Sequence, residues 1–106
     1  MVEQVYKISL TDEGTVEKVV MDENLHYIHM VFKKGGGLPE HFSNSHVYMT
    51  VLRGVLSIGL DDQEVKKYEA GSVLKIPFRT KMNVKNIDDP VLELIVIKAP
   101  SPDRMK

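Results

Sequence analysis

The chain has 106 residues, of which 42% are hydrophobic and 27% charged, and its formal net charge at pH 7 is -1. This length allows one domain with one modest core. The near-neutral charge gives no reason to expect a nucleic acid or an anionic membrane as a partner. The absence of cysteine excludes disulfides and thiolate chemistry and fits a cytoplasmic location. The N-terminal residues are too polar for a signal peptide, and no apolar run reaches the length of a membrane span.

Short β-type runs separated by turn residues follow one another along the chain. Residues 5–10 alternate apolar and polar and predict a first strand, whereas the run 15–21 fits a strand or a helix and its β-branched content favours a strand. Further strands are expected over residues 25–33, 47–52, 55–60, 63–69, 72–77 and 80–86. The run 91–98 is the most hydrophobic and should form a central strand. About ten short strands without a clear helix predict an all-β barrel or sandwich over residues 1–98, followed by a flexible tail at 99–106.

The stretch from Gly35 to Gly54 contains the most informative local pattern. Three consecutive glycines begin it and permit backbone conformations that side chains forbid, and Pro39 fixes its own φ and favours an extended residue before it. The chain therefore makes a tight, shaped entry just before His41. Gly54 separates two β-type runs and is a plausible hairpin corner or bulge.

This stretch resembles the first motif of the cupin family, G-x5-H-x-H-x3-4-E-x6-G. Gly35 matches the first glycine of the motif, His41 the first histidine and Gly54 the closing glycine. Counted back from Gly54, Ser43 stands at the second histidine and Val47 at the glutamate.

The second cupin motif, G-x5-P-x-G-x2-H-x3-N, is matched in part. Gly71, Pro77 and Asn86 fall on its outer glycine, proline and asparagine. Arg79 replaces the inner glycine, and Met82 replaces the histidine. The resemblance covers roughly residues 24–98 and implies a double-stranded β-helix, or jelly-roll, cupin barrel. It also implies that His41 is what remains of the family's set of three histidines and one glutamate.

Strand alternation assigns side chains to the inside and the outside of such a barrel. Counted from Gly54, three positions on each of two strands face the lumen. These are Val47, Met49 and Val51 on one strand and Thr80, Met82 and Val84 on the other. His46 and Tyr48 then face outward, although a bulge within residues 42–45 would turn His46 inward.

The run 25–33 has one face that is more apolar than the other. His26, Ile28, Met30 and Phe32 share it, so this face should line the lumen and His29 should not. Glu93 should face outward, because the residues on either side of it are apolar. Arg79, near the barrel mouth, could bind an anionic ligand through its planar guanidinium. The predicted ligand pocket comprises Met30, Phe32, His41, Val47, Met49, Arg79 and Met82.

Three functions are compatible with these residues. The favoured one is binding of a small organic ligand in the barrel, with an incomplete or absent metal site. The resemblance suggests a metal-dependent dioxygenase, isomerase or decarboxylase instead, with iron, manganese, nickel or zinc held by His41, His46 and His29. The third is a metal-free enzyme of the sugar-epimerase type, with His41 as base and Tyr27 or Tyr48 as proton donor.

The sequence also predicts a homodimer. The runs 25–33 and 91–98 are apolar on both faces, which one lumen cannot absorb. Tyr27, Val31 and Tyr48 would form an exposed row on the outer surface, and monomers rarely tolerate a large apolar patch.

Overall fold

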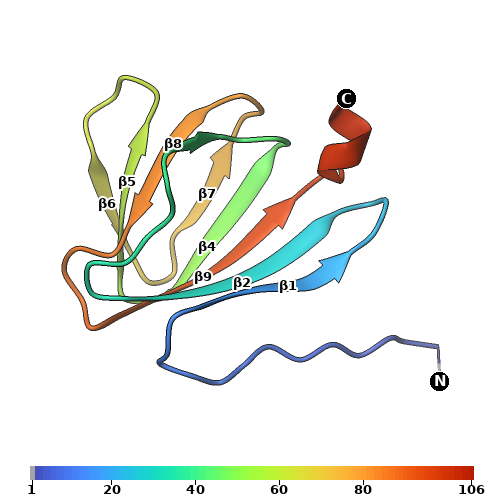
Figure 1. Cartoon of the computed structure of the whole chain (residues 1–106), viewed down its shortest axis with the longest axis horizontal. Coiled ribbons are helices and arrows are strands. Elements are labelled where there is room, and N and C mark those ends of the chain that lie inside the picture. Colours follow the sequence, from blue (N-terminus) through green and yellow to red (C-terminus); the bar gives the residue numbers. More distant parts are fainter. Residues whose placement is uncertain (1) are drawn as a thin grey trace.

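The structure is a computed structural model that describes residues 2–106, and it consists of two antiparallel sheets that face each other (Figure 1). One sheet has five strands in the order β1-β2-β9-β4-β7, and the other has four in the order β3-β8-β5-β6. The strands are β1 (Thr15–Met21), β2 (His26–Lys33), β3 (His41–Phe42), β4 (Val47–Arg53), β5 (Val55–Leu60), β6 (Lys66–Glu69), β7 (Val73–Ile76), β8 (Lys81–Lys85) and β9 (Val91–Lys98). Strand β9 is the middle strand of the larger sheet, so the predicted central position of residues 91–98 is confirmed.

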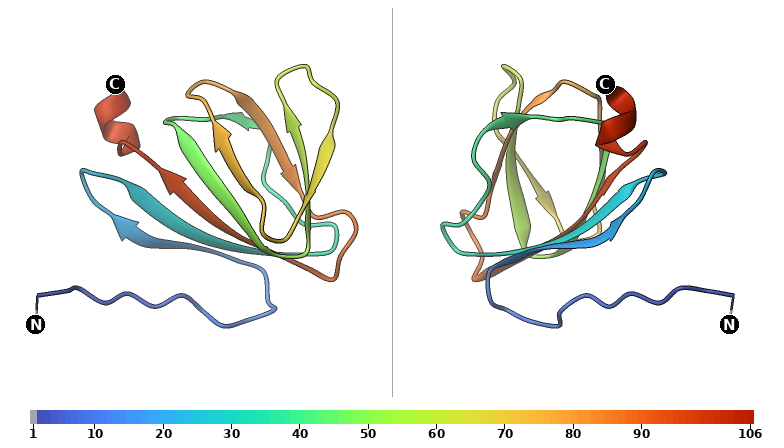
Figure 2. Two further views of the ribbon diagram at one scale, coloured as in Figure 1. Left: turned by 180° about the vertical axis from the view of Figure 1, so that it is seen from behind. Right: turned by 45° about the vertical axis from the view of Figure 1, so that its right-hand side comes forward.

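Figure 2 shows the two sheets facing each other, and the core lies between them, with inward side chains from both sheets. Strands β2 and β9 pair without interruption from His26 opposite Lys98 to Lys33 opposite Val91. This unbroken ladder keeps the alternation in phase, so that Ile28 and Met30 point into the core together with their neighbours on β9.

Gly54 fixes the register of β4 as the sequence predicts. Its φ is +81°, and a Cβ there would stand 2.2 Å from the carbonyl oxygen of Val91. A side chain at this corner would therefore push β9 away. With Gly54 in place, Val47, Met49 and Val51 are at most 1% exposed and face the core, as predicted.

The N-terminal end of the chain differs from expectation. Residues 5–10, for which alternation predicts a first strand, pair with no strand in the described chain and run beneath β1 and β2 in extended form (Figure 1). The pattern was right about the extended backbone and wrong about the sheet, because alternation does not supply a pairing partner. The C-terminal tail contains a short 3-10 helix, Pro102–Met105, and Ser101 before it is buried against His26. Within residues 2–106 no helix is long and apolar enough to cross a membrane.

Candidate functional site

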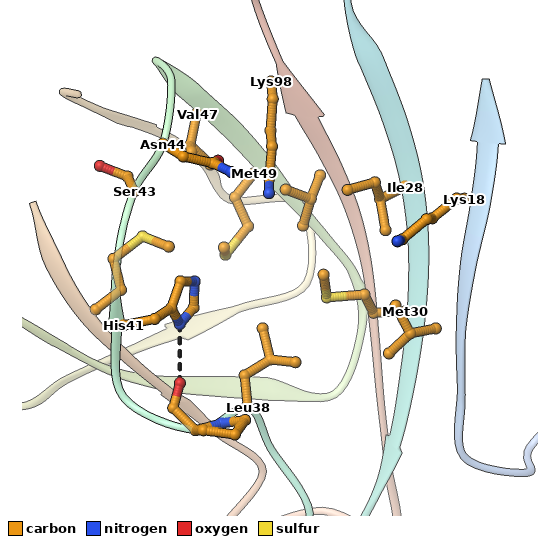
Figure 3. A pocket seen from close by; sticks show the side chains of 14 residues that line it. Lys18, Ile28, Met30, Leu38, His41, Ser43, Asn44, Val47, Met49 and Lys98 are labelled. Atoms are coloured by element: carbon orange, nitrogen blue, oxygen red, sulfur yellow. Dashed lines mark hydrogen bonds between the residues drawn. The ribbon is translucent and has the colours of Figure 1, made fainter. Parts of the chain in front are cut away.

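A cavity of about 310 Å³ opens at one end of the space between the sheets (Figure 3). Its walls come from both sheets and from the segment that links β2 to β4. The lining residues are Val16, Lys18, Ile28, Met30, Leu38, Pro39, His41, Ser43, Asn44, Val47, Met49, Met82, Val96 and Lys98.

Most of the cavity wall is apolar, and three methionines contribute to it. Met30 and Met49 come from the five-stranded sheet and Met82 from β8 of the other sheet. All three are buried. Thioether side chains are flexible and polarizable, so they adapt to the shape of an apolar ligand. Such a wall suits a small organic molecule better than a polar one.

His41 places one imidazole in this apolar wall. It begins the two-residue strand β3, opposite Met82, and its Nδ1 lies 2.8 Å from the carbonyl oxygen of Pro39. A carbonyl oxygen only accepts, so Nδ1 carries the hydrogen. In the neutral ring Nε2 is therefore left with its lone pair, and it faces the cavity (Figure 3). The glycine-rich entry and Pro39 thus orient the ring as well as position it.

Five of the seven residues predicted to form the pocket line this cavity. They are Met30, His41, Val47, Met49 and Met82. Phe32 and Arg79 do not. Phe32 is a core side chain one strand step beyond Met30, where the space between the sheets is filled. Arg79 is exposed at a corner, and its guanidinium lies over the Phe78 ring, 5.0 Å from its centroid.

The three histidines that the metal-enzyme alternative requires do not converge. His46 is exposed outside the barrel, where the Phe78 N–H lies 3.4 Å from its Nδ1. Strand alternation is not broken by a bulge within residues 42–45, so His46 stays outward while Val47 faces the core. His29 faces the outer side of β2.

The remaining positions of the family's metal set carry poor ligands. Ser43 uses its hydroxyl to donate to the Pro77 carbonyl and to accept from the Thr80 N–H. Val47 offers no donor atom, and Met82 offers a thioether, which suits only a soft metal ion. Among the described residues no group of three or more histidine, cysteine, aspartate or glutamate side chains could hold a metal ion. The residues present do not fit the divalent metal that the resemblance implies.

The acid–base pair of the third alternative is not assembled either. Neither Tyr27 nor Tyr48 belongs to the cavity wall, because both side chains face outward from the five-stranded sheet. Tyr48 lies under Lys75 on that outer face, with the ammonium 5.8 Å from the ring centroid. His41 therefore has no tyrosine beside it to act as its proton donor.

The outer face of the same sheet holds a charged cluster that the sequence did not reveal. His29 is 0% exposed and lies between two carboxylates, with Nδ1 2.7 Å from Glu17 and Nε2 2.6 Å from Glu93. Arg53 joins it through a 2.7 Å contact to the other oxygen of Glu93 and a 2.7 Å contact to Asp12. Glu93 thus faces outward as predicted, but it is buried.

Hydrogen bonds within this cluster stabilise the ionised forms of its carboxylates. Hydrogen bonds from Ser9, with a further one from His29, lower the pKa of Glu17 to about 2. Burial alone would raise the pKa of Glu93, but the hydrogen bonds from His29 and Arg53 outweigh it and lower that pKa below its usual value. Both carboxylates are therefore ionised near neutral pH, and both nitrogens of His29 donate to them, so that the ring is positively charged. The hydrogen bonds to Ser9 and Asp12 also tie the N-terminal segment to the sheet.

Two lysines at the cavity were missed by the sequence interpretation. Lys18 is on the edge strand β1, opposite Ile28, and Lys98 is the last residue of β9, between His26 on one side and Val47 on the other. Both side chains point to the cavity (Figure 3). The inward direction of Lys98 could have been predicted from the sequence, because Lys98 continues the inward alternation of the run 91–98 beyond Val96. The inward direction of Lys18 could not be predicted in this way, because a bulge between Lys18 and Val20 interrupts the alternation of β1.

Comparison with known proteins shows that the chain is similar over nearly its whole length to an archaeal protein. MJ0764 of Methanocaldococcus jannaschii, named as an uncharacterized protein, is 37% identical over 107 residues, which span 99% of this chain and 91% of the relative. Its crystal structure, described as an RmlC-like cupin family protein with a double-stranded β-helix fold, matches with a TM-score of 0.96 at 36% identity over 99% of this chain and 97% of that one. The predicted fold and family resemblance are confirmed by this likeness. No protein-family model matches the sequence.

More distant structures share the fold alone. A cupin superfamily protein from Desulfitobacterium hafniense has a TM-score of 0.74 at 14% identity and covers 88% of this chain, with 83% of its own chain covered. A cupin-2 domain protein from Shewanella frigidimarina has a TM-score of 0.68 at 15% identity, with 85% of each chain covered.

Proposed function

Because the chain belongs to the cupin family, we propose that its activity resides in the barrel, and that it binds a small, largely apolar organic molecule there without a bound metal. The observation that supports this most is the cavity of about 310 Å³, whose wall combines three methionines with a single imidazole. Ligand pockets have volumes from about 300 Å³ upward, so the occupant is small. The wall offers shape and apolar contact, and the His41 Nε2 offers one acceptor for a ligand hydroxyl or N–H.

The methionines make this proposal directly testable. Protein labelled with ¹³C at the methionine methyl groups is titrated with hexanamide, a neutral probe with an apolar tail, and followed by NMR. The methyl signals of Met30, Met49 and Met82 should shift, whereas those of Met21 and Met105, which are not part of the cavity wall, should not. Equal shifts at all of these methyls, or none, would contradict binding in the barrel.

Chain length provides a second criterion within the same experiment. Burial of each methylene contributes about 0.8 kcal/mol, or roughly a factor of four in affinity. Hexanamide should therefore bind about fiftyfold more tightly than propanamide, which is shorter by three methylenes. Affinity that does not change with length would show that the tail stays outside the apolar wall.

A matched pair of histidine variants tests the role of the imidazole. His41→Phe keeps a ring in the wall but removes the acceptor, and His46→Phe makes the same change outside the barrel. A net hydrogen bond contributes about 0.5–1.5 kcal/mol, so His41→Phe should weaken hexanamide binding by roughly twofold to tenfold. His46→Phe should leave it unchanged.

We also propose that the protein is a homodimer. The exposed apolar row predicted on the outer surface is incomplete, because Val31 is 0% exposed within the single chain. Other exposed apolar side chains support the proposal, namely Val2, Val5, Tyr6 and Leu10 on the extended N-terminal segment, each at least 51% exposed. Sedimentation equilibrium at micromolar concentration should give twice the chain mass, and a species of 12.0 kDa alone would contradict it. A cytoplasmic location remains a prediction from composition.

A further inference from the structure

We propose that the ligand of this cavity is an anion, specifically a small carboxylate with an apolar tail, and that Lys18 and Lys98 bind its carboxylate group at the mouth. This inference rests on the proposed binding function and specifies the chemical class of the ligand. It is carried by two ammonium groups that share the cavity, with no aspartate or glutamate among the described residues of its wall.

The strand register places the two lysines on the same face of the sheet. Lys18 is opposite Ile28, and Ile28 is opposite Val96, which lies two residues before Lys98 on β9. The two side chains therefore rise on either side of β2, one step apart along the strands. Figure 3 shows both turned toward the cavity, Lys98 from above Met49 and Lys18 from beyond Ile28.

Neither ammonium is neutralised by the protein itself. Among residues 2–106, neither Lys18 nor Lys98 has an ion pair or a side-chain hydrogen bond, whereas Lys33, Lys67 and Lys81 each have an acidic partner. The cavity wall contains no aspartate or glutamate within the described residues. The carboxylate cluster around His29 lies on the opposite face of the sheet.

Lys98 is held where its charge is unfavourable. Its side chain is half-buried, and burial together with the nearby Lys18 lowers its pKa below the usual lysine value. A charge that is partly removed from water and repelled by a like charge gains more from an anion than a surface lysine does. The apolar wall beyond the lysines then accommodates the tail.

The orientation of the ligand follows from the chemistry at the two ends of the cavity. A carboxylate has no hydrogen to give to a lone pair on Nε2 of His41. Its favourable partners are the two ammonium groups, so the carboxylate stays at the mouth and the tail extends toward Met30 and Met49.

Hexanoate and hexanamide form a matched pair of probes, because they share the same tail and differ only in the head group, which is an anion in hexanoate and neutral in hexanamide. With the ¹³C-methyl methionine signals as readout at low salt, hexanoate should bind at least about tenfold more tightly than hexanamide, since a hydrogen bond to a charged group commonly contributes that factor. The preference should shrink as sodium chloride is raised, because screening weakens interactions between partly exposed charges.

Lysine variants test whether the preference for hexanoate over hexanamide comes from Lys18 and Lys98. Lys98→Met and Lys18→Met should each reduce the ratio of hexanoate affinity to hexanamide affinity severalfold, and Lys98→Arg should retain this ratio. Lys66→Met, an exposed lysine on β6 away from the cavity, is the matched control and should have no effect. Because hexanamide binding reports an intact cavity, a variant that fails to fold is recognised by its loss.

The outcomes separate this inference from the proposed function. If hexanamide shifts the three cavity methyls and hexanoate binds no better, the anionic ligand is ruled out and the barrel remains an apolar binding site. The same holds if the preference survives both lysine-to-methionine changes. If neither probe shifts the cavity methyls, the binding function fails and the carboxylate inference fails with it.

Discussion

Charged and titratable side chains on the two sides of the five-stranded sheet differ in whether they have bonding partners within the protein. On the outer face, His29 contacts two carboxylates, one of which also contacts Arg53, so each charge of this cluster has a partner. In the cavity on its inner side, Lys98 of this sheet has no acidic partner among the described residues, and His41 of the facing sheet has one hydrogen bond, to a backbone carbonyl. The comparison teaches that a buried histidine with complete partners belongs to the structure, whereas groups with unmet bonding capacity beside a cavity are available to a ligand.

The alternation of β9 produces this division directly. Leu92, Leu94 and Val96 point inward and are at most 2% exposed, while Glu93 between them points outward. A one-residue slip of the strand would bury Glu93 in the apolar core and expose the leucines. The outer cluster therefore also favours the correct register of the central strand.

The largest effect should come from breaking the outer cluster. Glu93→Ala leaves His29 and Arg53 without their shared partner, and removal of one member of a buried ion pair typically costs about 3–5 kcal/mol. For a domain of this size the melting temperature should fall by on the order of 10 °C or more. Differential scanning calorimetry measures this, with the exposed Glu64→Ala as control. A change of similar size in both variants would mean that the cluster contributes nothing specific.

The contribution of the same cluster to stability should be visible in the unmodified protein as a fall in melting temperature at acidic pH. The pKa of Glu17 is about 2 in the folded state and near 4.5 when unperturbed, so its contribution to stability is complete above pH 4.5 and lost as the pH falls toward 2. The lowered pKa of Glu93 acts in the same direction. The melting temperature should hardly change from pH 7 to about 5 and then decline.

A glutamine variant tests the assignment of that acid decline. Glu17→Gln should lower the melting temperature at pH 7 and flatten the decline below pH 4.5, because the titrating group is gone. An acid decline as steep as in the unmodified protein would place its origin in other carboxylates.

The sequence predicted the fold and the inner wall better than it predicted the charges. Gly54 fixed the register because only a glycine permits so close an approach to Val91, and the inward positions of Val47 and Met49 followed from the alternation that it anchors. The outer cluster could not be predicted, because Glu17 and Glu93 are far apart in sequence and meet only through the register of β1, β2 and β9. Arg79 was misplaced because proximity to the mouth in sequence says nothing about which way a corner residue points.

A smaller change in melting temperature should distinguish Asp61 and Arg79, the two non-glycine residues among 2–106 that have left-handed backbone. Arg79 has φ 64° at the position where the family motif has glycine, and Asp61 has φ 50°. Left-handed backbone costs a residue with a Cβ about 1–2 kcal/mol, so Arg79→Gly should raise the melting temperature by a few degrees. Asp61→Gly should bring no gain, because the Asp61 carboxylate accepts a 2.9 Å hydrogen bond from the Lys81 N–H. A lower melting temperature for Arg79→Gly would show that its contact with Phe78 outweighs the backbone cost.

The smallest change in melting temperature is expected from divalent metal ions, which would bind only if the histidines formed a site inside the barrel. A metal bound at a hundredfold excess over its Kd stabilises a fold by about 2.7 kcal/mol, so an occupied three-histidine site would raise melting by on the order of 10 °C. Here His41 has Ser43, Val47 and Met82 at the other ligand positions, and His29 is already held by two carboxylates on the far face. Chelator-treated protein given about 100 μM manganese, iron(II), nickel or zinc should therefore shift by less than about 3 °C on the same arithmetic. His41→Ala and His46→Ala are the controls. A large shift that disappears in both variants would show that His46 turns inward beside His41, and that the inner face has a metal site after all.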